Sequence, residues 1–389
     1  MFFPKGIPAQ AAEARAAQVN ATIGQLTDGA GGAMPLGALS QYLTGLDLRD
    51  VFLYTPQGGQ KPLRAAWGKR MTKAGDPPIS SPFVTVGLTH GLSLVGDLFA
   101  DEDTDVLLPD PGWGNYDLIF GARHGARIIR YPVFKDGRFC ATSMAEALAQ
   151  VRTKAVVVLN FPGNPTGYTP TEAELRPWLD AIAATDKPLV VVSDDAYAGF
   201  VYESGRLPRS PFFEIATMDP ERVLAVKVDG ATKELVFFGA RVGFVTFGAQ
   251  GEAADILEEK LKGAARSSVS TAPAVSQAMV SAALKDPTLE TQRQEIFSQV
   301  TERYQTLKKA LLDADLPSVP FNSGFFAMVP TPGDPEALRQ RLLGDGVGVI
   351  SLKRHNAIRI AYSSTQAGAL PGLVESVAIA IQATKQTAP

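Results

Sequence analysis

Between residues 82 and 247 the chain alternates short apolar runs with segments of helical pattern, and this alternation constrains the fold more than any other feature. The apolar runs are rich in β-branched residues and end at Gly, Pro, Asn or Asp, as strands do. Strands joined by helices form a largely parallel sheet covered on both faces, which predicts the α/β class. We expect strands at 83–86, 105–108, 127–131, 155–160, 189–193, 223–228 and 242–247, with a helix such as 172–184 between most neighbours.

After residue 251 the pattern changes to longer helices and then to a small α/β unit. Helices are expected at 253–265 and 289–313, and the second is long enough to link two domains. A chain of 389 residues has room for one large domain with a smaller one appended. The small unit has predicted strands at 324–329, 347–351 and 357–361, a helix at 335–343 and a closing helix.

Composition excludes several classes of protein. The net charge of −3 argues against a nucleic-acid surface, which has a basic bias. The single cysteine, Cys140, excludes an internal disulfide framework and indicates a reducing compartment, and three histidines with one cysteine argue against a zinc site or other metal centre. Because no apolar run is long enough to span a membrane and residues 1–5 lack a signal-peptide core, we expect a cytoplasmic protein without membrane contact.

One stretch brings together an acid, a lysine and an arginine. Asp194 follows an apolar strand, and Lys233 precedes Arg241 by eight residues (241 − 233). Residues 160–167, Asn-Phe-Pro-Gly-Asn-Pro-Thr-Gly, come before them. Pyridoxal phosphate needs an anion opposite its ring nitrogen, an amine for its aldehyde and a cation for its phosphate. These residues therefore predict a site for that cofactor.

The ordered set of motifs, from about residue 20 to residue 359, resembles the class I/II aminotransferase family of fold-type I pyridoxal-phosphate enzymes, which holds aspartate and aromatic aminotransferases. The resemblance implies a mostly parallel seven-stranded sheet in a large domain, residues 46–298. It also implies a smaller α/β domain built from residues 1–45 and 299–389, and a homodimer with shared active sites. The boundary at residue 45 rests on the resemblance alone, since composition does not change there.

Lys233 is the predicted catalytic lysine. Most lysines are solvated surface cations, but this one lies just past an apolar strand and at the family's spacing to Arg241. The resemblance implies that it forms the internal aldimine and, once freed by substrate, moves a proton between the substrate α-carbon and the cofactor. An amine desolvated beside other cations has a lowered pKa and is nucleophilic. Lys227 is the nearest rival, but it lies inside the strand and has a different spacing.

Asp194 and Tyr197 are the other predicted catalytic residues. Asp194 could be a helix N-cap or turn residue, and spacing alone does not separate it from Asp195. The resemblance selects Asp194 to keep the cofactor's ring nitrogen protonated, with Tyr197 bonding the phenolic oxygen. Asn164 alone would indicate only a turn, whereas the resemblance has its amide reach the same oxygen. The Asn164–Pro165 bond is a candidate cis peptide.

The predicted phosphate cradle is the segment 87–91, Gly-Leu-Thr-His-Gly, between a strand and a helix. Backbone N–H groups at a helix N-terminus bind phosphate, although a plain helix start accounts for the glycines equally well. The resemblance implies contacts from the Leu88 backbone and the Thr89 hydroxyl, to which Arg241 adds a fork of donors. We expect His90 to be a helix N-terminal residue without a catalytic part, although it could approach the phosphate.

Three further positions bear on the cofactor. Trp113, between two glycines, matches the aromatic that stacks on the ring, although most tryptophans are simply core. Tyr54 resembles the tyrosine that crosses from the neighbouring subunit to the phosphate. Gly230 departs from the many relatives with a serine there, whose phosphate contact could be replaced by Thr232 or Ser270.

On the substrate side the main residue is Arg359. It interrupts an apolar strand, where a charge demands a partner, and the resemblance implies that it binds the substrate α-carboxylate. Gly24, Trp113 and Asn164 match positions that line the same pocket. Arg266 matches an arginine that reads a distal carboxylate across the dimer in the aspartate branch, but it could equally be a plain helix-end arginine.

The sequence therefore predicts a homodimeric aminotransferase acting on an L-amino acid, aspartate, glutamate or an aromatic one, and a 2-oxo acid. A lyase that breaks C–S bonds by β-elimination would share every cofactor contact and stays open as an alternative. A DNA-binding regulator on this fold is disfavoured because the residues before the cofactor domain show no basic helix-turn-helix pattern. A dinucleotide enzyme is disfavoured because no Gly-x-Gly-x-x-Gly opens the first strand-helix unit.

Overall fold

The computed structural model describes residues 6–386, so the ends of the predicted small domain, 1–5 and 387–389, lie outside the described residues. Its centre is a seven-stranded sheet in the order β2-β10-β9-β8-β7-β3-β4, in which every strand is parallel to the others except the antiparallel β10. This confirms the predicted α/β class with a mostly parallel seven-stranded sheet. The strands are β2 (Phe83–Val86), β3 (Asp105–Asp110), β4 (Arg127–Pro132), β7 (Ala155–Asn160), β8 (Leu189–Asp194), β9 (Val223–Gly230) and β10 (Val242–Phe247).

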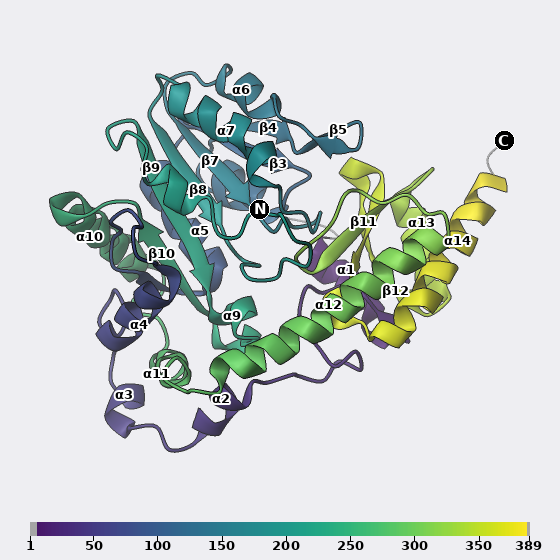
Figure 1. Cartoon of the computed structure of the whole chain (residues 1–389), viewed down its shortest axis with the longest axis horizontal. Coiled ribbons are helices and arrows are strands. Elements are labelled where there is room, and N and C mark those ends of the chain that lie inside the picture. The colour runs from purple at the N-terminus through teal and green to yellow at the C-terminus, as the bar shows by residue number, and fades with distance from the viewer. Residues whose placement is uncertain (1–5, 387–389) are drawn as a thin grey trace.

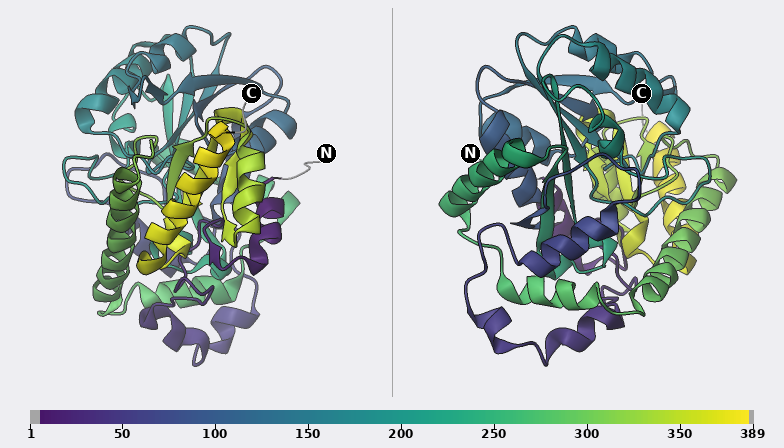
Figure 2. Two further views of the ribbon diagram at one scale, coloured as in Figure 1. Left: turned by 90° about the vertical axis from the view of Figure 1, so that its right-hand side faces the viewer. Right: turned by 60° about the vertical axis from the view of Figure 1, so that its left-hand side comes forward.

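Helices cover both faces of this sheet (Figures 1 and 2). Successive strand residues point to opposite faces. Val157 and Leu159 of β7 therefore pack with α6 and α7, whereas Val156 and Val158 pack with α5 and α10. The helices are α4 (Lys61–Met71), α5 (Gly87–Phe99), α6 (Ser143–Leu148), α7 (Glu172–Ala184), α8 (Phe212–Ile215), α9 (Ala231–Glu234), α10 (Gly251–Ser268), α11 (Ala274–Ala283) and α12 (Leu289–Asp313). Shorter elements are α2 (Gly37–Ser40), α3 (Leu48–Phe52), the π-helical turn Asp117–Ala122, and the hairpin of β5 (Phe134–Lys135) and β6 (Arg138–Phe139).

A second, smaller sheet lies beyond α12, which runs from beside α9 to α14 (Figure 1). Its three antiparallel strands are in the order β11-β14-β13, and β1 pairs with β12. The pairing of β1 places an N-terminal segment against the C-terminal unit, while the boundaries 45/46 and 298/299 stay predictions. The elements are α1 (Ile7–Glu13), β1 (Val19–Asn20), β11 (Phe326–Pro330), α13 (Pro335–Gly344), β12 (Val347–Gly348), β13 (Ile350–Leu352), β14 (Ala357–Ala361) and α14 (Leu370–Gln386).

Most predicted elements agree with the structure to within three residues, but two predictions were wrong in detail. The single strand expected at 347–351 is two strands, because β12 pairs with β1 while β13 pairs with β14. The strand expected from residue 324 begins at Phe326, because Gly324 adopts φ +69° in the preceding turn. Among residues 6–386, no helix is long and apolar enough to cross a membrane.

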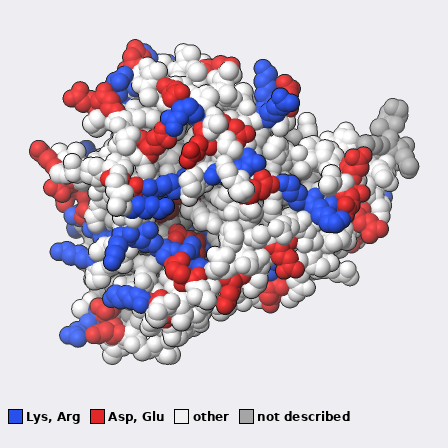
Figure 3. All heavy atoms as spheres, in the orientation of Figure 1, with Lys and Arg blue, Asp and Glu red and all other residues white. Residues whose placement is uncertain are grey.

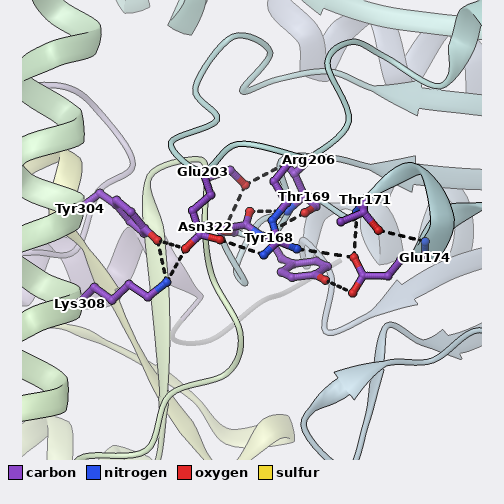
Figure 4. A network of polar contacts seen from close by, with 11 residues as sticks. Tyr168, Thr169, Thr171, Glu174, Glu203, Arg206, Tyr304, Lys308 and Asn322 are labelled. Atoms are coloured by element: carbon purple, nitrogen blue, oxygen red, sulfur yellow. Dashed lines mark hydrogen bonds and ion pairs between the residues drawn. The ribbon is translucent and has the colours of Figure 1, made fainter.

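A polar network joins α12 to the loops that follow β7 and β8 (Figure 4). Asn322, just before β11, accepts a hydrogen bond from the Thr169 N–H at 2.9 Å and donates to the Thr169 carbonyl at 3.0 Å. Glu203 accepts from the Tyr304 hydroxyl at 2.6 Å and also contacts Lys308 of α12. Burial opposes ionisation of Glu203, but these donors lower its pKa to about 2. The loops at the end of the large sheet are thereby fixed to the second unit.

Candidate active site

The predicted site residues gather at the carboxyl ends of β7 and β8, the edge at which parallel α/β sheets bind ligands. Asn160 ends β7 and lies opposite Asp194, which ends β8. The Asn160 side chain donates to the Asp194 carbonyl at 2.9 Å and accepts from the Asn164 N–H at 2.8 Å. Asn160 therefore holds two predicted site residues in place, and the predicted cis bond between Asn164 and Pro165 is confirmed.

The structure separates Asp194 from Asp195. Asp194 accepts hydrogen bonds from the Tyr116 hydroxyl at 2.5 Å and from the Ala196 N–H at 3.1 Å. Burial raises its pKa, against the effect of these donors and of the positive charge on Lys233. The Asp194 carboxylate is therefore a buried anion that a cation beside it would stabilise. Asp195 instead forms an ion pair with Lys227 at 2.8 Å.

Lys227 is a structural cation. It is 4% exposed and lies between Asp195 and Asp229, with its Nζ 2.5 Å from the Asp229 carboxylate. Burial opposes its charge, but the two carboxylates outweigh burial and raise the pKa of Lys227 above the usual range. The Trp67 indole N–H also donates to Asp229, at 3.1 Å. A lysine held in this way stays protonated and is not a nucleophile.

Lys233, on α9, has different surroundings. It is partly buried, and its Nζ lies 5.2 Å from the centroid of the Tyr197 ring. Among the described residues no carboxylate lies within ion-pair distance of it. Burial lowers its pKa to about 8; Arg241 acts in the same direction, while the charge of Asp194 opposes the shift. An appreciable share of neutral amine near neutral pH makes Lys233 a competent nucleophile and proton carrier.

Arg359, on β14, is a buried guanidinium without a carboxylate partner in the described part of the chain. It is 2% exposed and donates to the Thr22 carbonyl at 2.6 Å and to Asn164 Oδ1 at 3.3 Å, while its Nε has no hydrogen-bond partner within residues 6–386. The Phe326 ring lies 4.2 Å from the guanidinium carbon. Burial lowers the pKa of Arg359 to about 10, so it remains charged and suits an anionic ligand. A Cβ on Gly24 would lie 2.1 Å from the Phe326 ring, so a side chain there would displace the ring that faces Arg359.

Arg241 and the start of α5 form the predicted phosphate cradle. Gly87 adopts φ +73°, and a Cβ on it would lie 2.4 Å from Arg241 Nη2, so the guanidinium lies against the backbone there. Leu88 and Thr89 form the first turn of α5. The Val86 N–H donates to His90 Nδ1 at 3.0 Å, and burial lowers the pKa of His90, so this ring is a neutral helix cap. A helix N-terminus beside a guanidinium suits a phosphate.

Packing explains why Gly230 is not a serine. A Cβ there would lie 2.5 Å from the Val242 carbonyl oxygen and 2.7 Å from the Gly243 Cα, so β10 would have to move. Of the two residues that could replace the missing hydroxyl, Thr232 has a buried Oγ1 without a hydrogen-bond partner in the described residues. Ser270 is exposed and adopts φ +64°. Thr232 therefore offers a free hydroxyl next to the lysine.

Two predicted residues are not brought to the site within one chain. Tyr54 is 93% exposed, and Arg266 is exposed on the last turn of α10. Both predictions require a second copy of the chain. Trp113 is partly buried and lies edge-on to Tyr116, with ring centroids 5.4 Å apart. The ring of Trp113 is thus adjacent to the residue that bonds Asp194.

Sequence reasoning assigned no role to Tyr116, Asn160 or Phe326. Each contacts a predicted site residue directly: Asp194, Asn164 and Arg359, respectively. Asn160 could have been noticed, because it ends a buried strand at the same edge as Asp194. The contacts of Tyr116 and Phe326 join distant parts of the chain and leave no local pattern.

Comparisons with known proteins agree with this geometry. The family model described as aminotransferase class I and II matches residues 17–377. The chain belongs to the class I and II aminotransferase family. This family depends on pyridoxal phosphate. The residues here fit that cofactor: a lysine of lowered pKa, a buried carboxylate, an orphan Thr232 hydroxyl and a guanidinium at a helix start.

Two curated relatives and one solved structure illustrate the likeness within the family. The chain is 28% identical over 200 residues to an aspartate aminotransferase of Geobacillus stearothermophilus, covering 49% of this chain and 47% of that protein. It is 25% identical over 197 residues to aromatic-amino-acid aminotransferase 2 of Thermococcus litoralis, covering 49% and 48%. An aminotransferase structure from Anaerococcus prevotii superposes with a TM-score of 0.86 at 21% identity, covering 98% of each chain. The chain thus spans about half the length of the curated relatives it matches.

Proposed function

We propose that the protein is a pyridoxal-phosphate-dependent aminotransferase that moves an amino group between an L-amino acid and a 2-oxo acid. One observation supports this above all. Lys233 and Arg359 are cations withdrawn from water without a carboxylate partner among the described residues, and both lie around Asn164 and Tyr197. A phosphate-bearing cofactor and a substrate carboxylate would supply the missing negative charge.

Each residue then has a defined part. When bound, the cofactor supplies an electron sink for negative charge at the substrate α-carbon. Asp194 would hold its ring nitrogen, Arg241 and the start of α5 would hold its phosphate, and Trp113 would stack on its ring. Lys233 holds the cofactor and later takes up and returns a proton at the substrate α-carbon. Arg359 and Asn164 orient the substrate carboxylate.

The substrates that we propose are aspartate or glutamate, with aromatic amino acids as the second choice. Relatives named as aspartate and as aromatic-amino-acid aminotransferases support both. The exposed position of Arg266 is compatible with recognition of a distal carboxylate in a second subunit.

A homodimer with shared active sites is part of the proposal. Residues 43–54 form an exposed apolar segment, and large exposed apolar patches mark protein interfaces. The side chains concerned expose between 65% and 93% of their surface: Leu43, Leu48, Phe52, Leu53 and Tyr54. The net charge of −3 and the presence of both signs on the face in Figure 3 support the proposal that the protein does not bind nucleic acid. The single Cys140 suits the cytoplasmic location that we also propose.

The test is transamination by purified Lys233→Ala protein, with Lys309→Ala as the control because Lys309 is exposed on α12. Loss of the proton-transferring amine should lower turnover of aspartate with 2-oxoglutarate by about 10²–10⁴-fold or more. The control should keep full turnover. Retained transaminase activity in Lys233→Ala would overturn the proposal. If the wild-type protein releases pyruvate and ammonia from cysteine conjugates without any acceptor oxo acid, its chemistry is that of a lyase instead.

A further inference from the structure

The helix that bears Lys233 cannot hold itself in place. α9 has four residues, Ala231–Glu234, and a single helical turn is unstable on its own. Two residues after its end, Val236 adopts φ +52°, a conformation that β-branched residues avoid and that persists only where surrounding contacts impose it. Something outside α9 must therefore fix the position of the lysine.

A closed ring of four charged side chains meets this need. Glu234 of α9 pairs with Arg70 of α4 at 2.8 Å and with Arg293 of α12 at 3.5 Å. Arg70 and Arg293 each pair in turn with Glu290 of α12, at 2.5 and 2.6 Å. The ring (Arg70, Glu234, Glu290 and Arg293) is electrically balanced and joins three helices.

Arg293 makes the most specific contact in this ring. Its Nε donates to the backbone carbonyl of Glu234 at 3.1 Å, while its Nη2 faces the Glu234 carboxylate. One planar guanidinium thus binds both the end of α9 and the side chain of its last residue. The Glu234 side chain is 17% exposed and those of Arg70 and Arg293 are 22% exposed, so water screens these pairs less than surface pairs.

The ring also reaches the second unit. α12 carries Arg293 near one end, and further along it Arg303 donates to the Ser363 carbonyl. α12 therefore contacts both the helix that bears the lysine and the segment after β14. Among the described residues the ring shares no ion pair with Lys227 and Asp229 of β9 or with Asp195 after β8, although the charge of Glu234 helps to raise the pKa of Asp229.

We propose that Arg70 and Arg293 are positioning residues for the reaction. Acting through Glu234, they hold α9 in place and so keep the Lys233 amine away from water. Neither arginine is required to touch cofactor or substrate. The inference rests on the proposed function only in that Lys233 is the reactive amine. If α9 opens, water returns to the lysine.

Two measurements on the full-length protein test this directly. The first is hydrogen exchange of the peptide containing residues 231–236, where the Leu235 and Val236 N–H groups donate to Ala231 and Lys233 carbonyls. The second is the pH dependence of Lys233 modification by an amine-directed reagent in cofactor-free protein. We expect Arg293→Ala to speed the exchange about tenfold or more, as loss of about 1.4 kcal/mol of local stability does. The apparent pKa of Lys233 should rise from about 8 toward its ordinary 10.5.

The control is Arg176→Ala, which removes an exposed arginine that pairs with Glu214, and it should change neither readout. Arg293→Lys should fall between the two, because an ammonium cannot bind the carbonyl and the carboxylate as a planar fork. Should Arg293→Ala fail to fold, Glu234→Gln and Arg70→Lys each weaken one side of the ring and are measured in the same way. Unchanged exchange and an unchanged lysine pKa in the folded variants would overturn the inference.

These readouts do not use transaminase activity, so the two proposals can fail separately. If Lys233→Ala keeps its activity, the proposed function is wrong even where the ring controls α9. With the function intact, a turnover assay adds a further check. Arg293→Ala should lower kcat with little change in KM, since the substrate contacts of Arg359 are untouched. A loss confined to KM would contradict a positioning role at Lys233.

Discussion

Lys227 and Lys233 lie on consecutive elements, β9 and α9, and both are withdrawn from water, yet their chemistry is opposite. Lys227 lies between Asp195 and Asp229, and its pKa is raised despite burial. Lys233 has no carboxylate at ion-pair distance among the described residues, and burial lowers its pKa to about 8. Burial alone therefore does not make a lysine reactive; the carboxylates around it decide.

The same distinction separates two buried arginines. Arg339 of α13 is 1% exposed and pairs with Glu336 at 2.7 Å and Glu13 at 2.5 Å. Arg359 is 2% exposed and is held by neutral oxygens and an aromatic ring. In these two pairs the cations that have protein carboxylates are structural, whereas those with none among the described residues lie at the candidate site, where a ligand can supply the negative charge. Arg303 is also buried without such a carboxylate, but it joins α12 to the Ser363 carbonyl. The following predictions test this rule, in decreasing order of expected effect.

The largest effect is expected from Lys227→Met. It leaves Asp195 and Asp229 buried without their cation, and breaking a buried ion pair from one side costs about 3–5 kcal/mol. Urea unfolding of the variant should show a loss of that size. The double variant Lys227→Met/Asp229→Asn should recover part of it, because one buried charge is then removed as well. A Lys227→Met protein as stable as the wild type would break the comparison.

The two lysines should also respond oppositely to pH. The folded-state pKa of Lys233, about 8, is below its ordinary 10.5, so the charge on Lys233 destabilises the cofactor-free fold. This effect has its full size below pH 8. That cost, about 3 kcal/mol at most, fades as pH rises from 8 to 10.5. Lys233→Met should therefore be more stable than wild type at pH 7, with a gap that narrows toward pH 10.

Lys227 provides the control for that pH series. Its pKa is raised on folding, so the stability that it contributes is complete below 10.5 and is lost only as pH rises through the still higher folded pKa. The deficit of Lys227→Met should thus stay constant from pH 7 to 10. For each variant, the difference in free energy of unfolding from wild type is measured over this pH range. If the two differences change with pH in the same way, the pKa values of the two lysines are not shifted in opposite directions.

The surroundings of the two lysines also show which structural features can be predicted from the sequence. Strands 155–160 and 242–247 were predicted with their observed bounds, because every residue of both strands is buried and such strands leave near-continuous apolar runs. Lys227 and Asp229 are two residues apart on one strand, so their side chains point to the same face. This alternation indicates that they pair, independently of the spacing between either lysine and Arg241. The convergence of Asn164 and Asp194 followed from the common edge of parallel strands.

Other features could not be predicted from local pattern. Asp195 faces Lys227 because of a partner on the neighbouring strand, and nothing in the adjacent pair Asp194-Asp195 shows which of the two turns away. The Arg70–Glu234 and Arg293–Glu234 contacts join helices far apart in the chain. Their positions depend on how whole helices pack, which periodicity within one helix does not encode.

A smaller effect, on binding, is expected from Arg359→Gln. The change keeps a hydrogen-bond donor but removes the charge, and a hydrogen bond to a charged group contributes about 1.5–3 kcal/mol. KM for the amino acid should rise about 10–100-fold, while the cofactor-free protein should be no less stable, since an unpaired buried cation is lost. Arg339→Gln is the matched control and should do the reverse, lowering stability with KM unchanged. Equal effects on both quantities in the two variants would contradict the rule.

The smallest effect is expected from Phe326→Leu, which tests how Arg359 is held without a carboxylate. The Phe326 ring faces the guanidinium at 4.2 Å, and a desolvated cation–π contact contributes about 0.5–2 kcal/mol. KM for the amino acid should therefore rise about 2–30-fold with little change in kcat. Phe321→Leu is the control, because Phe321 is also buried but packs on Tyr304 and Tyr362, at 5.5 and 6.4 Å between ring centroids. If both substitutions raise KM alike, general packing rather than the ring beneath Arg359 positions the guanidinium.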